Sequence, residues 1–322
     1  MTAEEPDRVV LRFLAAPGDT TITDGVVSAG RLLEWIDKAA YACAVGWSQG
    51  YCVTAYVGNV DFRRPVRPGE LVEVRARIVQ TGRTSMHVLV AVRSRDPESP
   101  AFGSGEAMHC LAVMVAVDER GRPREVPEWT PSAVRELDLP ELIADRVVLR
   151  RRIQEAMLAA PYSSAGTAPR TTLRFLAAPG DVNFGGHVHG GTVMRWIDEA
   201  GFACAASWSS PSAVAVYAGG IQFAAPMRIG DLVEVDARLI HTTDRSMHIA
   251  IEARSAPLTA PDALTRNARC IAVYVVPAAG AAEPVRCFEP VSNEDRALDL
   301  HACELIALRA QIPALPDPLL TL

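Results

Sequence analysis

The chain has 322 residues, of which 49% are apolar, and a formal net charge of −6. This length suits two domains of ordinary size, and the acidic balance argues against a nucleic-acid partner. No apolar run reaches the roughly 18 residues of a membrane span, so no membrane partner is expected. The polar segment 1–8 lacks the pattern of a signal peptide. The seven cysteines include no C-x-x-C pair, which predicts reduced thiols and a cytoplasmic location.

The first half of the chain predicts a strand, one helix, a set of strands and a closing helical segment. Its helix pattern has apolar residues at spacings of three and four, and its strands are short apolar runs. The expected ranges are a helix at 31–47, strands at 52–62, 71–79, 86–92 and 108–117, and a helical segment at 132–158.

The second half repeats the first. Leu11 to Asp19 returns letter for letter as Leu173 to Asp181, and the match continues after a slip of one residue. A repeat this long predicts two domains, at 1–160 and 170–322, with a linker at 161–169. The second copy predicts a strand at 172–178, a glycine-rich loop at 181–191, a helix at 192–208, strands at 213–223, 232–239, 248–253 and 270–276, and a closing helix at 293–312.

One buried helix followed by consecutive antiparallel strands predicts an α+β fold in which a sheet wraps around the helix. The second copy has a characteristic set of loop, helix, strand and turn residues: Pro179 to Asn183, Gly185 to Gly191, Trp196 to Gly201, Phe223, Pro226, Gly230-Asp231 and Arg245 to Met247. In these residues the chain resembles the hotdog-fold acyl-CoA thioesterases of the brain acyl-CoA hydrolase type, in their double-hotdog form. The resemblance implies hydrolysis of an acyl-CoA to a carboxylic acid and coenzyme A.

In the family that this chain resembles, a loop asparagine and a helix acid fifteen residues later form the catalytic pair. Asn183 and Asp198 have this spacing, whereas the first copy has Asp37 but Thr21 and Ile22 in place of the asparagine. Asp198 lies seven residues past Gly191, about 10 Å along the helix, so Asn183 is not expected to reach it. We therefore predict a composite site of Asn183 with Asp37, and a degenerate second site at Asp198.

Other side chains have ordinary and functional interpretations. The aspartates could belong to a solvent-facing stripe, and Asn183 could simply cap a turn. The Gly190 and Gly191 N–H groups begin a helix and could stabilise an oxyanion. The ordinary interpretation of the arginines near the strand ends is that they are solvated surface residues. A weaker hypothesis is that some of them, with neighbouring serines, bind the phosphates of coenzyme A. That hypothesis covers Arg63, Arg64, Arg83, Ser85, Arg245 and Ser246.

No metal or redox cofactor is expected, because His187 and His189 lack an evident third ligand. The resemblance implies a homotrimer of double-hotdog chains, which contains six hotdog units. Two alternatives stay open. One is a hotdog hydratase or dehydratase acting on an enoyl or hydroxyacyl thioester, and the other is a non-catalytic acyl-CoA-binding protein.

Overall fold

Contacts divide the chain into two compact units. The computed structural model describes residues 6–21, 25–62, 64–99, 108–131, 139–160, 162 and 165–313. One unit comprises Met1–Arg146 with Pro313–Leu322, and the other comprises Val147–Ile312. The division falls within helix α2 (Leu139–Ala159), ahead of the domain boundary that we drew at residue 160.

The first unit is an antiparallel sheet packed against one long helix, α1 (Ala29–Ser48). Hydrogen bonds join its strands in the order β1-β4-β5-β6-β2. The strands are β1 (Arg8–Leu14), β2 (Cys52–Val57), β3 (Val60–Asp61), β4 (Leu71–Thr81), β5 (Ser85–Arg95) and β6 (Met108–Ala116). The single strand expected at 52–62 is interrupted after Val57, where the Gly58 N–H donates to the Leu111 carbonyl at 2.9 Å.

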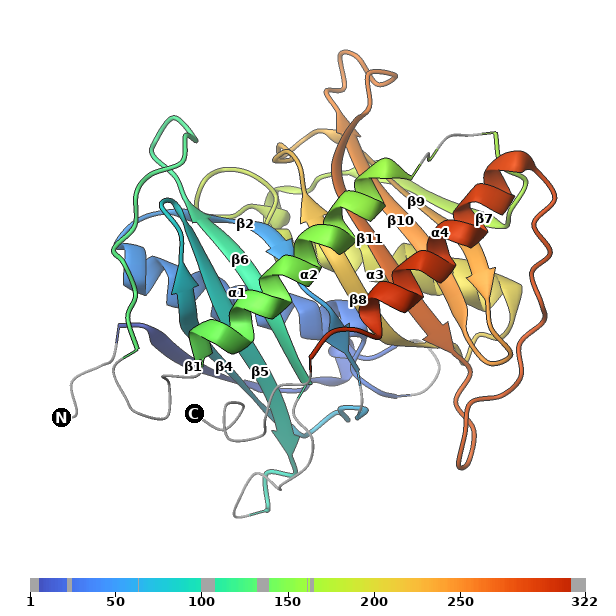
Figure 1. Ribbon diagram of the computed structural model, residues 1–322, viewed down its shortest axis with the longest axis horizontal. Helices are drawn as coiled ribbons and strands as arrows, with labels where there is room; N and C mark the ends of the chain where they lie inside the picture. Colours follow the sequence, from blue (N-terminus) through green and yellow to red (C-terminus); the bar gives the residue numbers. More distant parts are fainter. Residues whose placement is uncertain are drawn as a thin grey trace. The chain divides into compact units, whose positions relative to one another are not determined.

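The second unit has the same strand order, β7-β9-β10-β11-β8, around helix α3 (Gly190–Trp208), as Figure 1 shows. Its strands are β7 (Arg170–Leu176), β8 (Val214–Phe223), β9 (Leu232–Thr242), β10 (Met247–Ala256) and β11 (Thr265–Val275). The repeat in sequence is therefore a repeat in structure. The helices begin within two residues of the expected starts, and the expected closing helix at 293–312 is α4 (Asn293–Arg309).

Both central helices are anchored by the same aromatic pair. Trp35 of α1 stacks on Phe13 with ring centroids 5.0 Å apart, and Trp196 of α3 meets Phe175 edge-on at 4.8 Å. Both tryptophans are buried, as are Cys43 and Ala44 further along α1. The helix sequences are apolar on most sides because strands surround them, which leaves few positions for charged residues.

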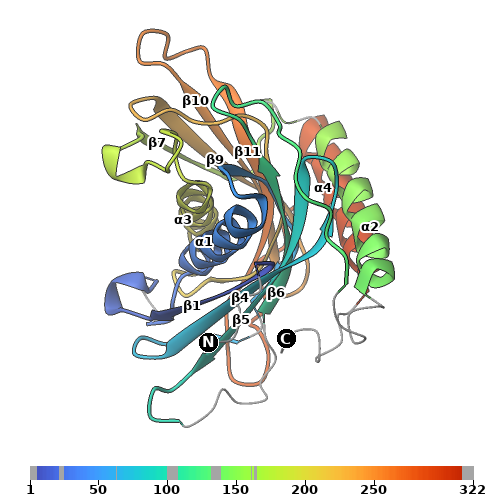
Figure 2. The ribbon, with the colours of Figure 1, turned by 90° about the vertical axis from the view of Figure 1, so that its left-hand side faces the viewer.

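A second layer covers the other face of the second unit's sheet. Helices α2 and α4 lie there, on the face opposite α3 (Figure 2). Their buried side chains form one apolar cluster with the sheet: Leu149, Ile153, Met157, Ile240, Ala250, Ile271, Leu298, Ala302, Leu305 and Leu308. This packing explains why residues 147–159, which the repeat assigns to the first copy, group with the second unit. Residues 132–138 of that expected helical segment lie outside the described residues.

Among the described helices, none combines the length and apolar composition needed to cross a lipid bilayer.

Candidate active site

The loop before α3 is organised by Asn183. Its Oδ1 accepts hydrogen bonds from the N–H groups of Gly185 at 2.8 Å and His187 at 3.1 Å. Its Nδ2 group directs one hydrogen toward the Val188 carbonyl at 3.4 Å. Gly186 closes the turn at φ +81, a left-handed conformation that glycine adopts without strain. Asn183 thus has the turn-capping role that a loop asparagine often has, and its amide retains a second N–H donor.

The equivalent loop in the first unit identifies which residue replaces the asparagine. The Thr21 N–H donates to the Val26 carbonyl at 2.8 Å, as the Asn183 N–H donates to the His187 carbonyl at 2.7 Å. Thr21 is therefore the counterpart of Asn183, and the one-residue slip between the copies falls between Thr21 and Val26. Ile22, the other candidate, lies outside the described residues. The first copy thus has a buried hydroxyl where the second has an amide.

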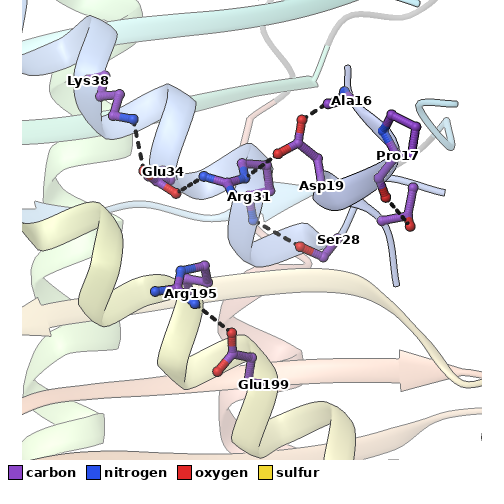
Figure 3. Close-up of polar contacts among 10 residues, drawn as sticks. Ala16, Pro17, Asp19, Ser28, Arg31, Glu34, Lys38, Arg195 and Glu199 are labelled. Atoms are coloured by element: carbon purple, nitrogen blue, oxygen red, sulfur yellow. Dashed lines mark hydrogen bonds and ion pairs between the residues drawn. The ribbon is translucent and has the colours of Figure 1, made fainter. Parts of the chain in front are cut away.

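Side chains cap both central helices. The Ser28 Oγ accepts the Arg31 N–H at 3.2 Å, and the His189 Nδ1 accepts the Gly191 N–H at 3.0 Å. Figure 3 shows the Ser28 cap and the ion pair of Arg31 with Asp19. The Gly191 N–H, which we expected to face substrate, is therefore engaged by His189. Gly190 is the first residue of α3, where an N–H has no acceptor within the helix.

Asp37 and Asp198 occupy equivalent helix positions but have different surroundings. Asp37 is 2% exposed, and its Oδ1 accepts a 2.6 Å hydrogen bond from the Thr54 hydroxyl. Asp198 is partly exposed, and the Tyr274 hydroxyl lies 3.1 Å from both its Oδ1 and its backbone carbonyl. Burial raises the pKa of Tyr274 well above its usual value, so this phenol stays protonated and donates.

The two hydroxyls come from different strands. Thr54 of β2 pairs with Met114 of β6, and the corresponding pair in the second unit is Ala215 with Tyr274. The donor has therefore moved from one strand to its neighbour between the copies. Neither Thr54 nor Tyr274 was identified from sequence. Comparing the copies position by position could have found Thr54, because its counterpart is an alanine.

Tyr274 fits because the helix opposite carries a glycine. A Cβ atom at Gly201 would lie 2.5 Å from the Tyr274 hydroxyl, closer than two unbonded atoms can approach. The first unit has Ala40 at the matching helix position and Met114 on the strand. Gly201 with Tyr274, and Ala40 with Met114, are thus two packing solutions to the same contact.

The solvent-facing stripe that we considered for the helix aspartates is formed by neighbouring charged residues. Glu34 pairs with Lys38, and Arg195 pairs with Glu199, each at 2.8 Å (Figure 3). These pairs form the expected charged stripes. Asp37 does not belong to such a stripe, because it is buried and its Oδ1 faces Thr54. Such burial of an acid is costly unless the carboxylate is hydrogen-bonded.

Several of the candidate phosphate-binding residues already contact other groups of the protein. Arg64 pairs with Glu70 at 3.3 Å, and Arg245 donates to the Ala282 carbonyl. Arg83 is exposed, and its carbonyl accepts the Val126 N–H at 3.0 Å. Ser85 accepts the Gly82 N–H at its carbonyl, and the Ser246 hydroxyl lies 2.7 Å from that of Thr243. Arg63 lies outside the described residues.

Burial also bears on cysteine chemistry. It raises the pKa of the Cys43, Cys110, Cys204 and Cys270 thiols to about 12. Thiols with so high a pKa remain protonated and are poor nucleophiles. These four residues are core residues, as expected from the apolar runs that contain them.

The fold defines a tandem hotdog protein, in which each unit packs one long helix against an antiparallel sheet. The thioesterase superfamily model matches residues 24–101 and 185–260, once in each copy. The chain is 36% identical over 120 residues to the acyl-CoA thioester hydrolase YciA of Escherichia coli, covering 37% of this chain and 90% of that protein. The chain belongs to the thioesterase superfamily. This membership confirms the family, the duplicated hotdog fold and the thioester hydrolase class predicted from the sequence.

Two further comparisons show similarity in sequence and in fold. Protein VdlD of Helicobacter pylori is 31% identical over 153 residues, which is 47% of this chain and 86% of that protein. The crystal structure of an acyl-ACP thioesterase from Bacteroides thetaiotaomicron superposes with a TM-score of 0.52 at 12% identity. That match covers 84% of this chain and 99% of the other, so the likeness of fold extends over both copies.

Proposed function

We propose that this protein hydrolyses acyl-CoA thioesters, converting acyl-CoA and water to a carboxylic acid and coenzyme A. Family membership and the name of the Escherichia coli relative support the reaction and its substrate class. The assignment of residues rests on one observation: each copy keeps a different member of the proposed catalytic pair. The second copy keeps the loop asparagine, and the first copy keeps a buried aspartate with a threonine donor.

The proposed catalytic pair is Asn183 with Asp37. Asp198 is the weaker candidate because its partner loop would supply Thr21 in place of an amide. Asn183 also precedes α3, whereas Asp198 lies seven residues beyond Gly191, about 10 Å along the axis. These features support one intact site for each chain and one degenerate site.

Each group has a defined task in the proposed reaction. The Asp37 carboxylate can remove a proton from water as that water attacks the thioester carbon. Alternatively it attacks the carbon itself and forms an anhydride, which water then hydrolyses to release the acid and restore the carboxylate. Thr54 holds Oδ1 of Asp37 and so limits rotation of the carboxylate. The remaining N–H of the Asn183 amide and the Gly190 N–H donate to the thioester oxygen as it gains charge. The thiolate of coenzyme A leaves, and no redox cofactor takes part.

Fewer observations support the residues that we propose to bind the phosphates of coenzyme A. Arg83 is an exposed candidate, while Arg64 and Arg245 would have to exchange protein partners for phosphate. Arg63, Ser85 and Ser246 complete the proposed set. Bidentate contact with a phosphate is the reason to favour the arginines.

We also propose a cytoplasmic homotrimer. The seven cysteines are all free thiols, which suits a reducing compartment. The trimer follows from the family resemblance and would contain six hotdog units. Sedimentation equilibrium would test it directly: a mass three times that of the chain is expected, and a monomeric mass at micromolar concentration would contradict it.

The decisive experiment combines a substrate panel with a matched pair of variants. Release of free thiol would be measured with acyl-CoAs from acetyl to palmitoyl and with one aromatic acyl-CoA. Asp37→Asn should lower kcat about 100-fold or more, as expected for loss of a general base, while Asp198→Asn should stay within a few-fold of wild type. The reverse result would contradict the composite site. Binding without turnover of any acyl-CoA would favour a hydratase or a non-catalytic binder.

A further inference from the structure

Three metal-binding side chains converge on the outer face of the second unit. His241 lies on β9, and Asp299 and Cys303 lie on α4. One donor atom from each residue lies within 4.8 Å of the other two. Asp299 and Cys303 are four residues apart, so they project from the same side of the helix, one turn from each other.

Rigid elements hold this cluster in place. The His241 Nδ1 lies 2.8 Å from Oδ1 of Asp299. The buried ring of His248 packs edge-on against His241, with centroids 5.3 Å apart. On α4, Leu298 and Ala302 are buried in the apolar cluster and fix the rotation of the helix. Donors on a packed strand and helix keep their relative positions better than donors on a loop.

The chemistry of the donor set selects the ion. Imidazole nitrogen and thiolate sulfur suit zinc, whereas calcium and magnesium prefer oxygen ligands alone. Zn–N and Zn–O bonds of about 2.0 Å and a Zn–S bond of about 2.3 Å place tetrahedral ligands about 3.3 to 3.5 Å apart. The cluster approaches this spacing, so small side-chain rotations would complete it.

We propose that His241, Asp299 and Cys303 bind one zinc ion, with water in the fourth position. Binding replaces the direct His241–Asp299 contact by two metal bonds, and it releases the proton of the Cys303 thiol to solvent. Because the ligands join α4 to β9, the ion ties the outer helix to the sheet. The nearby Arg309 guanidinium lies over the Tyr217 ring, 4.5 Å from its centroid, so its position is fixed by a contact outside the ligand set.

This site is specific to the second copy. The strand position of His241 is Gln80 in the first copy, since Gln80 pairs with His87 as His241 pairs with His248. The position of Cys303 is Leu142, which offers no donor. Helix α4 also covers the sheet face opposite α3, which carries Asp198 and follows the Asn183 loop (Figure 2). The proposed ion is therefore separate from the thioesterase chemistry, and it departs from our expectation that the chain binds no metal.

The test uses the full chain, without a histidine tag, reduced and stripped of metal. Isothermal titration with zinc chloride should give one site for each chain, and cobalt(II) should give a thiolate-to-metal charge-transfer band. Cys303→Ser, His241→Gln and Asp299→Asn should each weaken zinc binding at least 10-fold. Cys287→Ser, which removes the other exposed thiol, should leave it unchanged.

Thiol alkylation gives a second readout that does not depend on folding of the variants. Zinc should protect Cys303 from alkylation, while Cys287 continues to react. Cys303→Ser is the variant least able to disturb the fold, because the side chain is exposed. Absence of zinc binding to the wild-type chain, or wild-type zinc affinity in all three ligand variants, would overturn the proposal. So would alkylation of Cys303 at the same rate with and without zinc.

Discussion

The Thr54 hydroxyl donates a 2.6 Å hydrogen bond to the carboxylate of the buried Asp37. Its counterpart in the second unit is the contact of Tyr274 with Asp198, made from the neighbouring strand. A duplicated helix acid has thus kept a hydroxyl partner in both copies while the strand that supplies it has changed.

Removing the Thr54 hydroxyl should impair catalysis. Thr54→Val keeps the shape of the side chain but leaves a buried carboxylate oxygen without its donor, a loss of about 1.5 to 3 kcal/mol, or roughly 10-fold or more in rate. The change should appear in kcat, because Asp37 acts in the chemical step. Thr54→Ser restores a hydroxyl and should recover most of the activity. An unchanged kcat in Thr54→Val would remove Thr54 from the mechanism.

Replacing Asn183 by aspartate separates its two roles. Asn183→Asp keeps an Oδ acceptor for the Gly185 and His187 N–H groups, so the loop should hold its conformation. It loses the Nδ2 donor and places a negative charge where the thioester oxygen gains charge. We expect a loss of about 100-fold or more in kcat.

The structural side of this prediction has its own control. Amide hydrogen exchange at Gly185 and His187 should match wild type in Asn183→Asp and should increase in Asn183→Ala, which removes the acceptor. If Asn183→Asp retains activity, the asparagine serves only to cap its turn.

Substitutions at Gly201 and Tyr274 should have strongly coupled effects on the free energy of unfolding. Gly201→Ala places a methyl group 2.5 Å from the Tyr274 hydroxyl and should cost about 1 to 3 kcal/mol. Adding Tyr274→Met recreates the Ala40 and Met114 combination of the first unit and should relieve the clash. Urea unfolding of both single variants and the double variant would give the coupling energy, which should exceed about 0.5 kcal/mol. Additive effects would show that the helix and strand adjust independently.

Sequence reasoning recovered the elements whose pattern is local. The duplicated apolar periodicities located α1, α3 and most strands, because helix and strand periods reflect which face is buried. It missed the Thr54–Asp37 and Tyr274–Asp198 contacts, which join residues far apart in the chain through strand pairing. It also predicted that the Gly191 N–H faces the substrate, because sequence alone gives little sign that a histidine caps the helix.

The boundary between the units depends on contacts of the same long-range kind. Residues 147–159 continue the first repeat in sequence, yet Ile153 and Met157 complete the apolar cluster under α4. Composition alone could not assign them, because an amphipathic helix can bury its apolar face against any available sheet.

Asp295 should make folding stability sensitive to acid. Burial alone would raise its pKa, but hydrogen bonds from Thr167 and Ser292 outweigh burial and hold the pKa below the usual 3.8. The unfolded chain therefore binds this proton more readily than the folded chain. The stabilisation is fully present above about pH 3.8 and is lost as the pH falls below that value toward the pKa of the folded state.

Asp295→Asn should show this dependence directly. At neutral pH it weakens the contacts that attach Thr167 and Ala168 to the start of α4, and we expect a loss of about 2 kcal/mol in the free energy of unfolding. The difference from wild type should shrink in acid, where the native carboxyl is also protonated. Urea unfolding at neutral and acidic pH would measure it, with the exposed Asp262→Asn as control. A loss that is the same at both pH values would mean that charge on Asp295 contributes nothing.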